Sequence, residues 1–174
     1  MPKPNKNIVF IGFMGSGKSS TSKFLAKTLR RKVFSTDQII VKEQGRSIAQ
    51  IFREEGEAYF RQLEKKTVAK LAKYKNVIID CGGGIVLNPD NIKRLKKNGI
   101  LVYLKTSPAW ILKRVKKTGK RPLLNVNQPL KKIKELLRKR AALYNQADVT
   151  IRTDEKTPRE VAREVYEQCQ RLIK

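Results

Sequence analysis

The sequence of 174 residues contains no histidine. This absence excludes Ser-His-Asp triads, Cys-His nucleophile pairs, histidine general bases and histidine-ligated metals. An enzyme with this composition has to work with carboxylates, lysine, arginine, serine, threonine, backbone amides or a hard metal ion.

Cysteine is also scarce. The two cysteines, Cys81 and Cys169, match no disulfide framework and no zinc-binding pattern. We therefore expect reduced thiols and a cytoplasmic protein. No apolar stretch approaches the ~20 residues of a membrane span, so we expect no membrane partner.

Acidic residues are few: 15 Asp and Glu stand against 40 Lys and Arg, which gives a net charge of +25. Such a charge can indicate a nucleic-acid partner. The basic residues are spread along the whole chain, however, and no aromatic residues are interleaved with them for base stacking. We expect the basic residues to lie on solvated helix faces and the protein to have no specific nucleic-acid partner. The alternative function is a basic nucleotide-dependent RNA-binding module.

Short apolar runs alternate with longer stretches of helical periodicity. The apolar runs that predict strands cover residues 8–11, 33–34, 77–79, 100–104 and 149–151. Helices are predicted over residues 21–29 and 48–72, the second with a break near Gly56. Further helix starts, where a capping residue precedes a proline, lie at Asn88, Ser107 and Thr157. This alternation predicts one three-layer α/β domain, residues 1–174, with five parallel strands covered on both faces.

The strongest motif is GFMGSGKS at residues 12–19, which satisfies GxxxxGK[ST]. It follows an apolar strand and enters a helix, the context in which glycine amides and a helix N-terminus bind phosphate. Lys18 is expected to reach the β- and γ-phosphates of a nucleotide, and Ser19 to coordinate Mg²⁺. The predicted nucleotide contacts here are Gly12, Met14, Gly15, Ser16, Gly17, Lys18, Ser19 and Ser20.

Three further clusters suggest an acceptor site. One of them, residues 51–64, is on its own typical of an ordinary amphipathic helix pair with solvated charges. Asp37 follows the second strand, where a carboxylate can orient a substrate hydroxyl and accept its proton, or cap the next helix. Three consecutive glycines, Gly82, Gly83 and Gly84, follow the third strand. A close approach of a ligand to the backbone would explain them, and so would an ordinary tight turn.

Taken together, the motifs of residues 8–165 occur in the order found in the shikimate kinase family, and this part of the chain resembles that family. The phosphate loop is common to many kinases. The more specific motifs are Ile51-Phe52…Gly56-Glu57…Phe60-Arg61…Glu64, the glycine triplet, Arg121-Pro122-Leu123-Leu124 and Arg140…Tyr144…Ala147-Asp148. The resemblance implies a P-loop kinase fold with strand order 2-3-1-4-5, an acceptor-binding region at about residues 36–65 and a mobile lid at about residues 116–128. It also implies transfer of the γ-phosphoryl group of ATP, with Mg²⁺, to the 3-hydroxyl of shikimate.

The resemblance also implies roles for single residues. Arg61 and Arg140 would hold the shikimate carboxylate, beside Gly82, Gly83 and Gly84, and Glu64 would fix Arg61. Asp37 would hold the ring hydroxyls and orient the attacking one. Arg121 would swing over the phosphates from the lid, and Lys117 would pack on adenine. The predicted catalytic residues are thus Asp37, Lys18 and Arg121.

The sequence departs from the family pattern at two residues and in the length of one segment. Ser35 stands where the family usually has an aspartate, and Asp80 stands where it more often has a small or neutral residue. Our hypothesis is that Asp80 supplies the missing carboxylate to the Mg²⁺ site. The lid is also a few residues shorter than usual. We expect a monomer; the alternative activity is a P-loop kinase for gluconate or a nucleoside monophosphate.

Overall fold

A computed structural model of the chain describes residues 6–118, 124 and 126–172. Strands and helices alternate along it. Their order is β1 (Asn7–Ile11), α1 (Lys18–Leu29), β2 (Val33–Ser35), α2 (Thr36–Gln44), α3 (Ile48–Leu71), β3 (Ile78–Asp80), the 3-10 helix η1 (Ile85–Leu87), α4 (Pro89–Asn98), β4 (Gly99–Lys105), α5 (Pro108–Thr118), α6 (Pro129–Tyr144), β5 (Val149–Arg152) and α7 (Pro158–Arg171).

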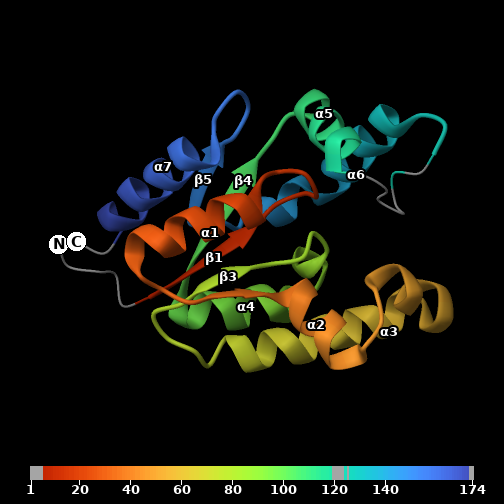
Figure 1. Ribbon diagram of the computed structural model, residues 1–174, viewed down its shortest axis with the longest axis horizontal. Coiled ribbons are helices and arrows are strands. Elements are labelled where there is room, and N and C mark those ends of the chain that lie inside the picture. Colours follow the sequence, from red (N-terminus) through yellow and green to blue (C-terminus); the bar gives the residue numbers. More distant parts are fainter. Residues whose placement is uncertain (1–5, 119–123, 125, 173–174) are drawn as a thin grey trace.

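The strands form one parallel sheet in the order β2-β3-β1-β4-β5, which confirms the predicted topology. In Figure 1, β1 lies between β3 and β4. In the sheet register, Phe10 of β1 and Ser35 of β2 both lie opposite Asp80 of β3. Because all strands are parallel, their carboxyl ends meet at one edge, where open α/β sheets bind their ligands.

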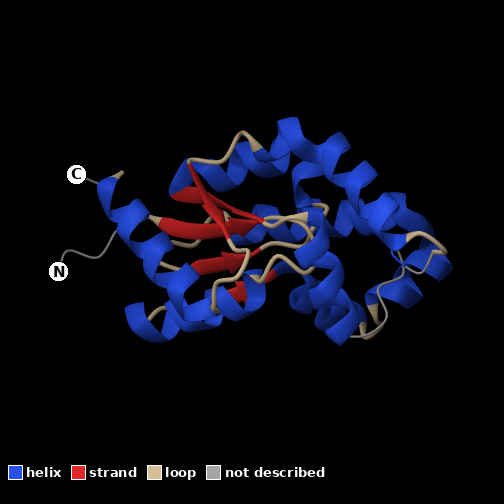
Figure 2. Cartoon of the chain, turned by 90° about the horizontal axis from the view of Figure 1, so that it is seen from above, coloured by secondary structure: helices blue, strands red, loops and turns tan. Residues whose placement is uncertain are grey.

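Helices cover both faces of the sheet, as Figure 2 shows from above. Side chains of β1 alternate between these faces. Ile8 and Phe10 belong to a buried cluster with residues of α1 and α7. Val9 and Ile11 belong to a second cluster, with residues of α3, α4 and α6. The predicted three-layer α/β arrangement is therefore confirmed.

Two pairs of helices flank the carboxyl edge of the sheet. Helices α2 and α3 pack on each other on one side, and α5 and α6 pack on each other on the other side (Figure 1). Helix α3 breaks at Gly56, whose φ is 83° and ψ 173°, as predicted. Helix α7 begins with a reciprocal capping box between Thr157 and Glu160. No helix in the described ranges is both long and apolar enough to cross a membrane.

Candidate active site

The phosphate loop, residues 12–19, depends on glycine for its backbone path. Gly12, Gly15 and Gly17 have φ angles of 151°, 75° and 91°, which other residues rarely adopt. A side chain at Gly12 would also lie 2.8 Å from Ser16 Oγ and 2.9 Å from the carbonyl oxygen of Leu104. Gly17 is the N-cap residue of α1 and provides no side-chain hydrogen bond. This helix N-terminus has the form that binds phosphate in other loops of this kind.

Lys18 is folded over the loop itself. Its side chain is buried, and Nζ donates hydrogen bonds to the carbonyl oxygens of Gly12, over 2.8 Å, and Phe13, over 3.0 Å. The ammonium group therefore already lies among the backbone groups that would surround a phosphate.

Asp80 and Ser19 form a pair of oxygen donors beside the loop. The Asp80 carboxylate is buried at the end of β3, and its Oδ2 accepts a hydrogen bond from Ser19 Oγ over 2.6 Å. Burial raises the pKa of Asp80, whereas the Ser19 hydroxyl and the Lys18 charge lower it. The described residues hold no cluster of three or more His, Cys, Asp or Glu side chains suited to a metal. The pair nevertheless fits Mg²⁺, which typically takes one or two carboxylates together with water and substrate phosphates.

Two carboxylates converge on the glycine turn, residues 82–84. A Cβ on Gly82 would overlap the Asp37 carboxylate and lie 3.3 Å from Glu64 Oε1. Asp37 lies in the first turn of α2, but the cap of that helix is Ser35, whose Oγ accepts a hydrogen bond from the Gln38 amide over 3.4 Å. Capping of α2 is therefore the role of Ser35, and the Asp37 carboxylate lies at the glycine turn. Only glycine at position 82 leaves room for this arrangement.

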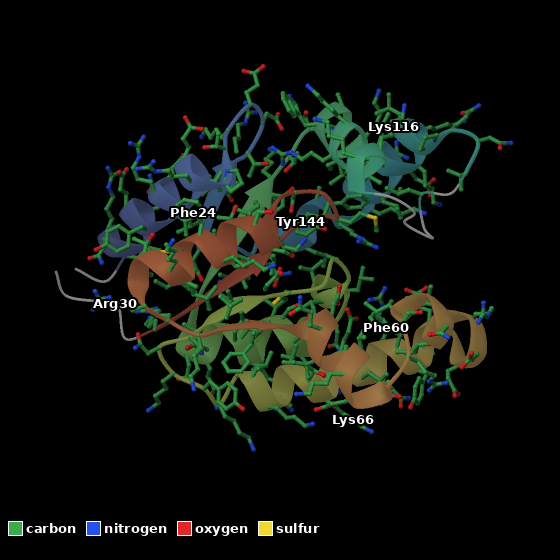
Figure 3. All side chains as sticks on the ribbon, in the orientation of Figure 1. Phe24, Arg30, Phe60, Lys66, Lys116 and Tyr144 are labelled. Atoms are coloured by element: carbon green, nitrogen blue, oxygen red, sulfur yellow. The ribbon has the colours of Figure 1, made fainter. Side chains whose placement is uncertain are left out.

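Arg61 reaches the same turn from α3. Its Nη1 donates to Glu64 Oε2 over 2.6 Å and its Nη2 to Glu57 Oε1 over 2.8 Å. The guanidinium occupies the space that a side chain on Gly84 would need, and it lies 5.5 Å from the ring centre of Phe60, labelled in Figure 3. Burial lowers the pKa of Arg61, but the charge of Glu64 and the hydrogen bonds to Glu64 and Glu57 outweigh it, so the net shift is upward. Arg61 therefore stays charged.

Arg140 reaches the glycine turn from a different helix, α6. The residue is 6% exposed. Its Nη1 donates a hydrogen bond to the carbonyl oxygen of Gly83 over 3.1 Å, and its guanidinium carbon lies 5.6 Å from the ring centre of Phe13. Tyr144, labelled near the centre of Figure 3, is buried one turn further along α6. The structure thus brings Arg61 and Arg140 to one turn, although they are far apart in the sequence.

Glu64 is the carboxylate most strongly affected by its surroundings. Its side chain is 1% exposed. Burial raises its pKa to about 6, although the charge and hydrogen bond of Arg61 act in the opposite direction. Glu64 therefore titrates closer to neutral pH than an ordinary glutamate does.

A cavity of about 520 Å³ connects the phosphate loop with the glycine turn. The predicted site residues that border it are Met14, Gly15, Ser16, Gly17, Lys18, Ser19, Ser20, Asp37, Asp80, Gly82, Gly83 and Lys117. The others that the structure describes are not among its lining residues; these are Gly12, Arg61, Glu64, Gly84 and Arg140. Gly12 lies within the phosphate loop, and the remaining four meet at the glycine turn. Arg121 lies outside the described residues.

Sequence reasoning missed one wall of this cavity. Arg114, Thr153, Lys156 and Pro158 border it. Arg114 is held in place because its Nη2 donates to the Thr153 carbonyl oxygen over 2.6 Å and its Nη1 to Thr153 Oγ1 over 2.9 Å. One signal was available: Arg114 precedes Lys117 by three residues on α5, so both share a helix face.

Comparisons with known proteins agree with this geometry. The family model described as shikimate kinase matches residues 14–170. The shikimate kinase of Caldanaerobacter subterraneus subsp. tengcongensis is 49% identical over 160 residues, which cover 92% of this chain and 94% of that protein. The shikimate kinase of Thermodesulfovibrio yellowstonii is 44% identical over 167 residues, which cover 96% of each.

A solved structure of the shikimate kinase from Acinetobacter baumannii, in complex with shikimate, superposes with a TM-score of 0.92. The sequences are 34% identical, and the match covers 97% of this chain and 94% of that one. The sheet order and the phosphate loop, beside a glycine turn that two arginines from α3 and α6 contact, define a P-loop kinase of small molecules. Within that class, the chain belongs to the shikimate kinase family.

Proposed function

We propose that the chain transfers the γ-phosphoryl group of ATP to the 3-hydroxyl of shikimate, giving shikimate 3-phosphate and ADP for chorismate and aromatic amino-acid biosynthesis. The observation that carries the proposal is the meeting of Arg61 and Arg140, from two different helices, at a turn that borders the nucleotide cavity. Guanidinium groups match carboxylates in geometry and stay charged. Shikimate has the carboxylate that such a pair requires, whereas a nucleotide acceptor would not need this pair.

On the nucleotide side, the amides of the phosphate loop and Lys18 hold the phosphates. Lys117, which borders the cavity at the end of α5, packs on the adenine. Fixed amides and a buried ammonium group stabilise charge on the moving phosphoryl group without having to reorganise first. Lys18 is thus both a binding and a catalytic residue.

On the acceptor side, Asp37 holds the ring hydroxyls and orients the 3-hydroxyl toward the γ-phosphate. It borders both the cavity and Gly82, which supports a position between the two substrates. Its carboxylate accepts the proton of the attacking hydroxyl. Most of the rate then comes from positioning and from charge neutralisation, as in phosphoryl transfer generally.

Ser19 and Asp80 would hold Mg²⁺. Bound there, the ion would supply positive charge that neutralises the nucleotide phosphates. Ser35 is uncharged, and Asp80 is its direct partner on the neighbouring strand. This register supports the hypothesis that Asp80 replaces the carboxylate that the family usually has at position 35.

Three parts of the proposal stay predictions. Arg121, from a lid at about residues 116–128, closes over the phosphates and excludes water as a competing acceptor. The chain acts as a monomer and as one domain, with the acceptor region at about residues 36–65. It works in the cytoplasm, consistent with two buried cysteines that carry free thiols.

The test is a measurement of ADP release from ATP and Mg²⁺ with and without shikimate. We expect turnover with shikimate well above the background of ATP hydrolysis. Gluconate and nucleoside monophosphates serve as matched acceptors and should give background rates. Equal or faster turnover with either one would refute the proposed substrate.

A further inference from the structure

One carboxylate oxygen at the glycine turn has no hydrogen-bond partner in the part of the chain that the structure describes. Glu64 Oε2 accepts the hydrogen bond from Arg61, but Oε1 is buried and has no hydrogen-bond partner among the described residues. Ionised oxygens in such a position are unfavourable, because burial removes the water that would otherwise solvate them. A proton on Oε1 would relieve this cost and turn the oxygen into a donor.

The charged and titratable groups around Glu64 come from several different elements. They are Arg61 on its own helix, Asp37 on α2, Arg140 on α6 and Cys81 after β3, with Glu57 on the far side of Arg61. The two arginines favour the ionised form of Glu64, and Asp37 opposes it. Burial raises the pKa of the Cys81 thiol well above its usual range, so this group stays neutral.

A substrate acid would change this balance. The following argument rests on the proposed function, in which Arg61 and Arg140 hold the shikimate carboxylate. That carboxylate adds a negative charge to the cluster and shares Arg61 with Glu64, whose own side chain already bonds Nη1. A third carboxylate beside Glu64 and Asp37 repels their negative charges and so favours protonation of one of them. Glu64 is the one whose pKa is already raised.

We propose that Glu64 takes up a proton from solvent when shikimate binds, so that substrate affinity is linked to the protonation of this one side chain. Glu64 is then a positioning residue that acts through Arg61. Its pKa of about 6 before substrate binds is the starting point for the uptake. Because binding is tighter to the protonated form, shikimate affinity falls as the pH rises through this range.

The composition makes the effect measurable. The chain has no histidine, the side-chain type that usually titrates between pH 5 and 8. Both cysteine thiols have raised pKa values, that of Cys169 to about 12. Proton uptake near neutral pH therefore reports on few groups.

Isothermal titration calorimetry measures how many protons are taken up when shikimate binds. The titrations are made without nucleotide, in buffers of different ionisation enthalpy. If the substrate charge raises the Glu64 pKa by about one unit, the wild type takes up ~0.5 proton at pH 6.5 and nearly none at pH 8.5. Glu64→Gln keeps the size of the side chain and cannot titrate, so its uptake should be near zero. Glu57→Gln is the matched control, because Glu57 also bonds Arg61 but is exposed; it should behave like the wild type.

Equal proton numbers in the wild type and Glu64→Gln would overturn the proposal, as would zero uptake by the wild type at pH 6.5 despite firm binding. The wild-type measurement alone decides the matter if the variant does not fold. No detectable binding of shikimate to the folded wild type would overturn the proposed function itself, an outcome distinct from binding without proton uptake.

Discussion

Moving a carboxylate between neighbouring strands tests the proposed metal site. The first variant is Asp80→Asn, which keeps the size of the side chain and removes its charge. Asp80 and Ser19 are the two protein groups assigned to Mg²⁺, joined by a hydrogen bond of 2.6 Å. Loss of even a supporting carboxylate typically lowers metal affinity ~10–100-fold. We expect a loss of at least this size, about 1.4–2.7 kcal/mol of binding free energy.

The second variant adds Ser35→Asp to Asp80→Asn. Ser35 and Asp80 are paired residues in the β2–β3 register, and adjacent strands lie about 4.8 Å apart, so the added carboxylate stays at the same sheet edge. Aspartate caps helices as well as serine does, so α2 keeps its cap. The double variant should regain most of the lost affinity.

The assay is Mn²⁺ binding to the complex of enzyme and ADP, followed by electron paramagnetic resonance, so that it does not depend on turnover. Asp90→Asn, which changes an exposed aspartate on α4, serves as the control. Burial raises the pKa of Asp80, so the ionised side chain is unfavourable to folding and metal-free Asp80→Asn should be at least as stable as the wild type. Unchanged metal affinity in Asp80→Asn would refute the reasoning, and so would a double variant no better than the single one.

Two further predictions concern α3. Arg61→Ala should weaken shikimate binding ~30–1,000-fold, about 2–4 kcal/mol, and ATP binding far less. The control is Arg53→Ala, which changes an exposed arginine on the same helix. Equal losses of affinity for both ligands in Arg61→Ala would mean that Arg61 is structural. Because folding raises the Glu64 pKa from 4.5 to about 6, the free energy of unfolding should fall by about 2 kcal/mol as the pH rises from 4.5 to 7. Urea titrations should show this fall in the wild type and not in Glu64→Gln.

Much of the fold was predictable from local sequence. The predicted strands that became β1, β3 and β4 are apolar runs whose side chains are buried on both faces of the sheet, so the pattern follows directly from the packing. The phosphate loop was predictable because its motif is contiguous and lies between a strand and a helix. The break at Gly56 was also visible, since glycine readily adopts the positive φ found there.

The acceptor site was accessible only through resemblance to a family. Residues 51–64 alone read as an amphipathic helix, and nothing local shows that Arg61 turns toward Gly84. Arg140 meets Gly83 across 57 positions of sequence. Likewise, the pairing of Ser35 with Asp80 is a matter of strand register. Such contacts depend on the tertiary fold, which short sequence patterns do not encode.

The central claim is that Arg61 and Arg140 at the glycine turn hold the carboxylate of the acceptor. It is tested most directly by comparing the affinities of wild type and Arg140→Ala for shikimate and for its primary amide. The wild type should prefer the acid ~10–100-fold, because a charged acceptor bonds a guanidinium more strongly, and Arg140→Ala should lose most of this preference. If Arg140→Ala weakens acid and amide equally, Arg140 only supports the Gly83 backbone and the claim is wrong.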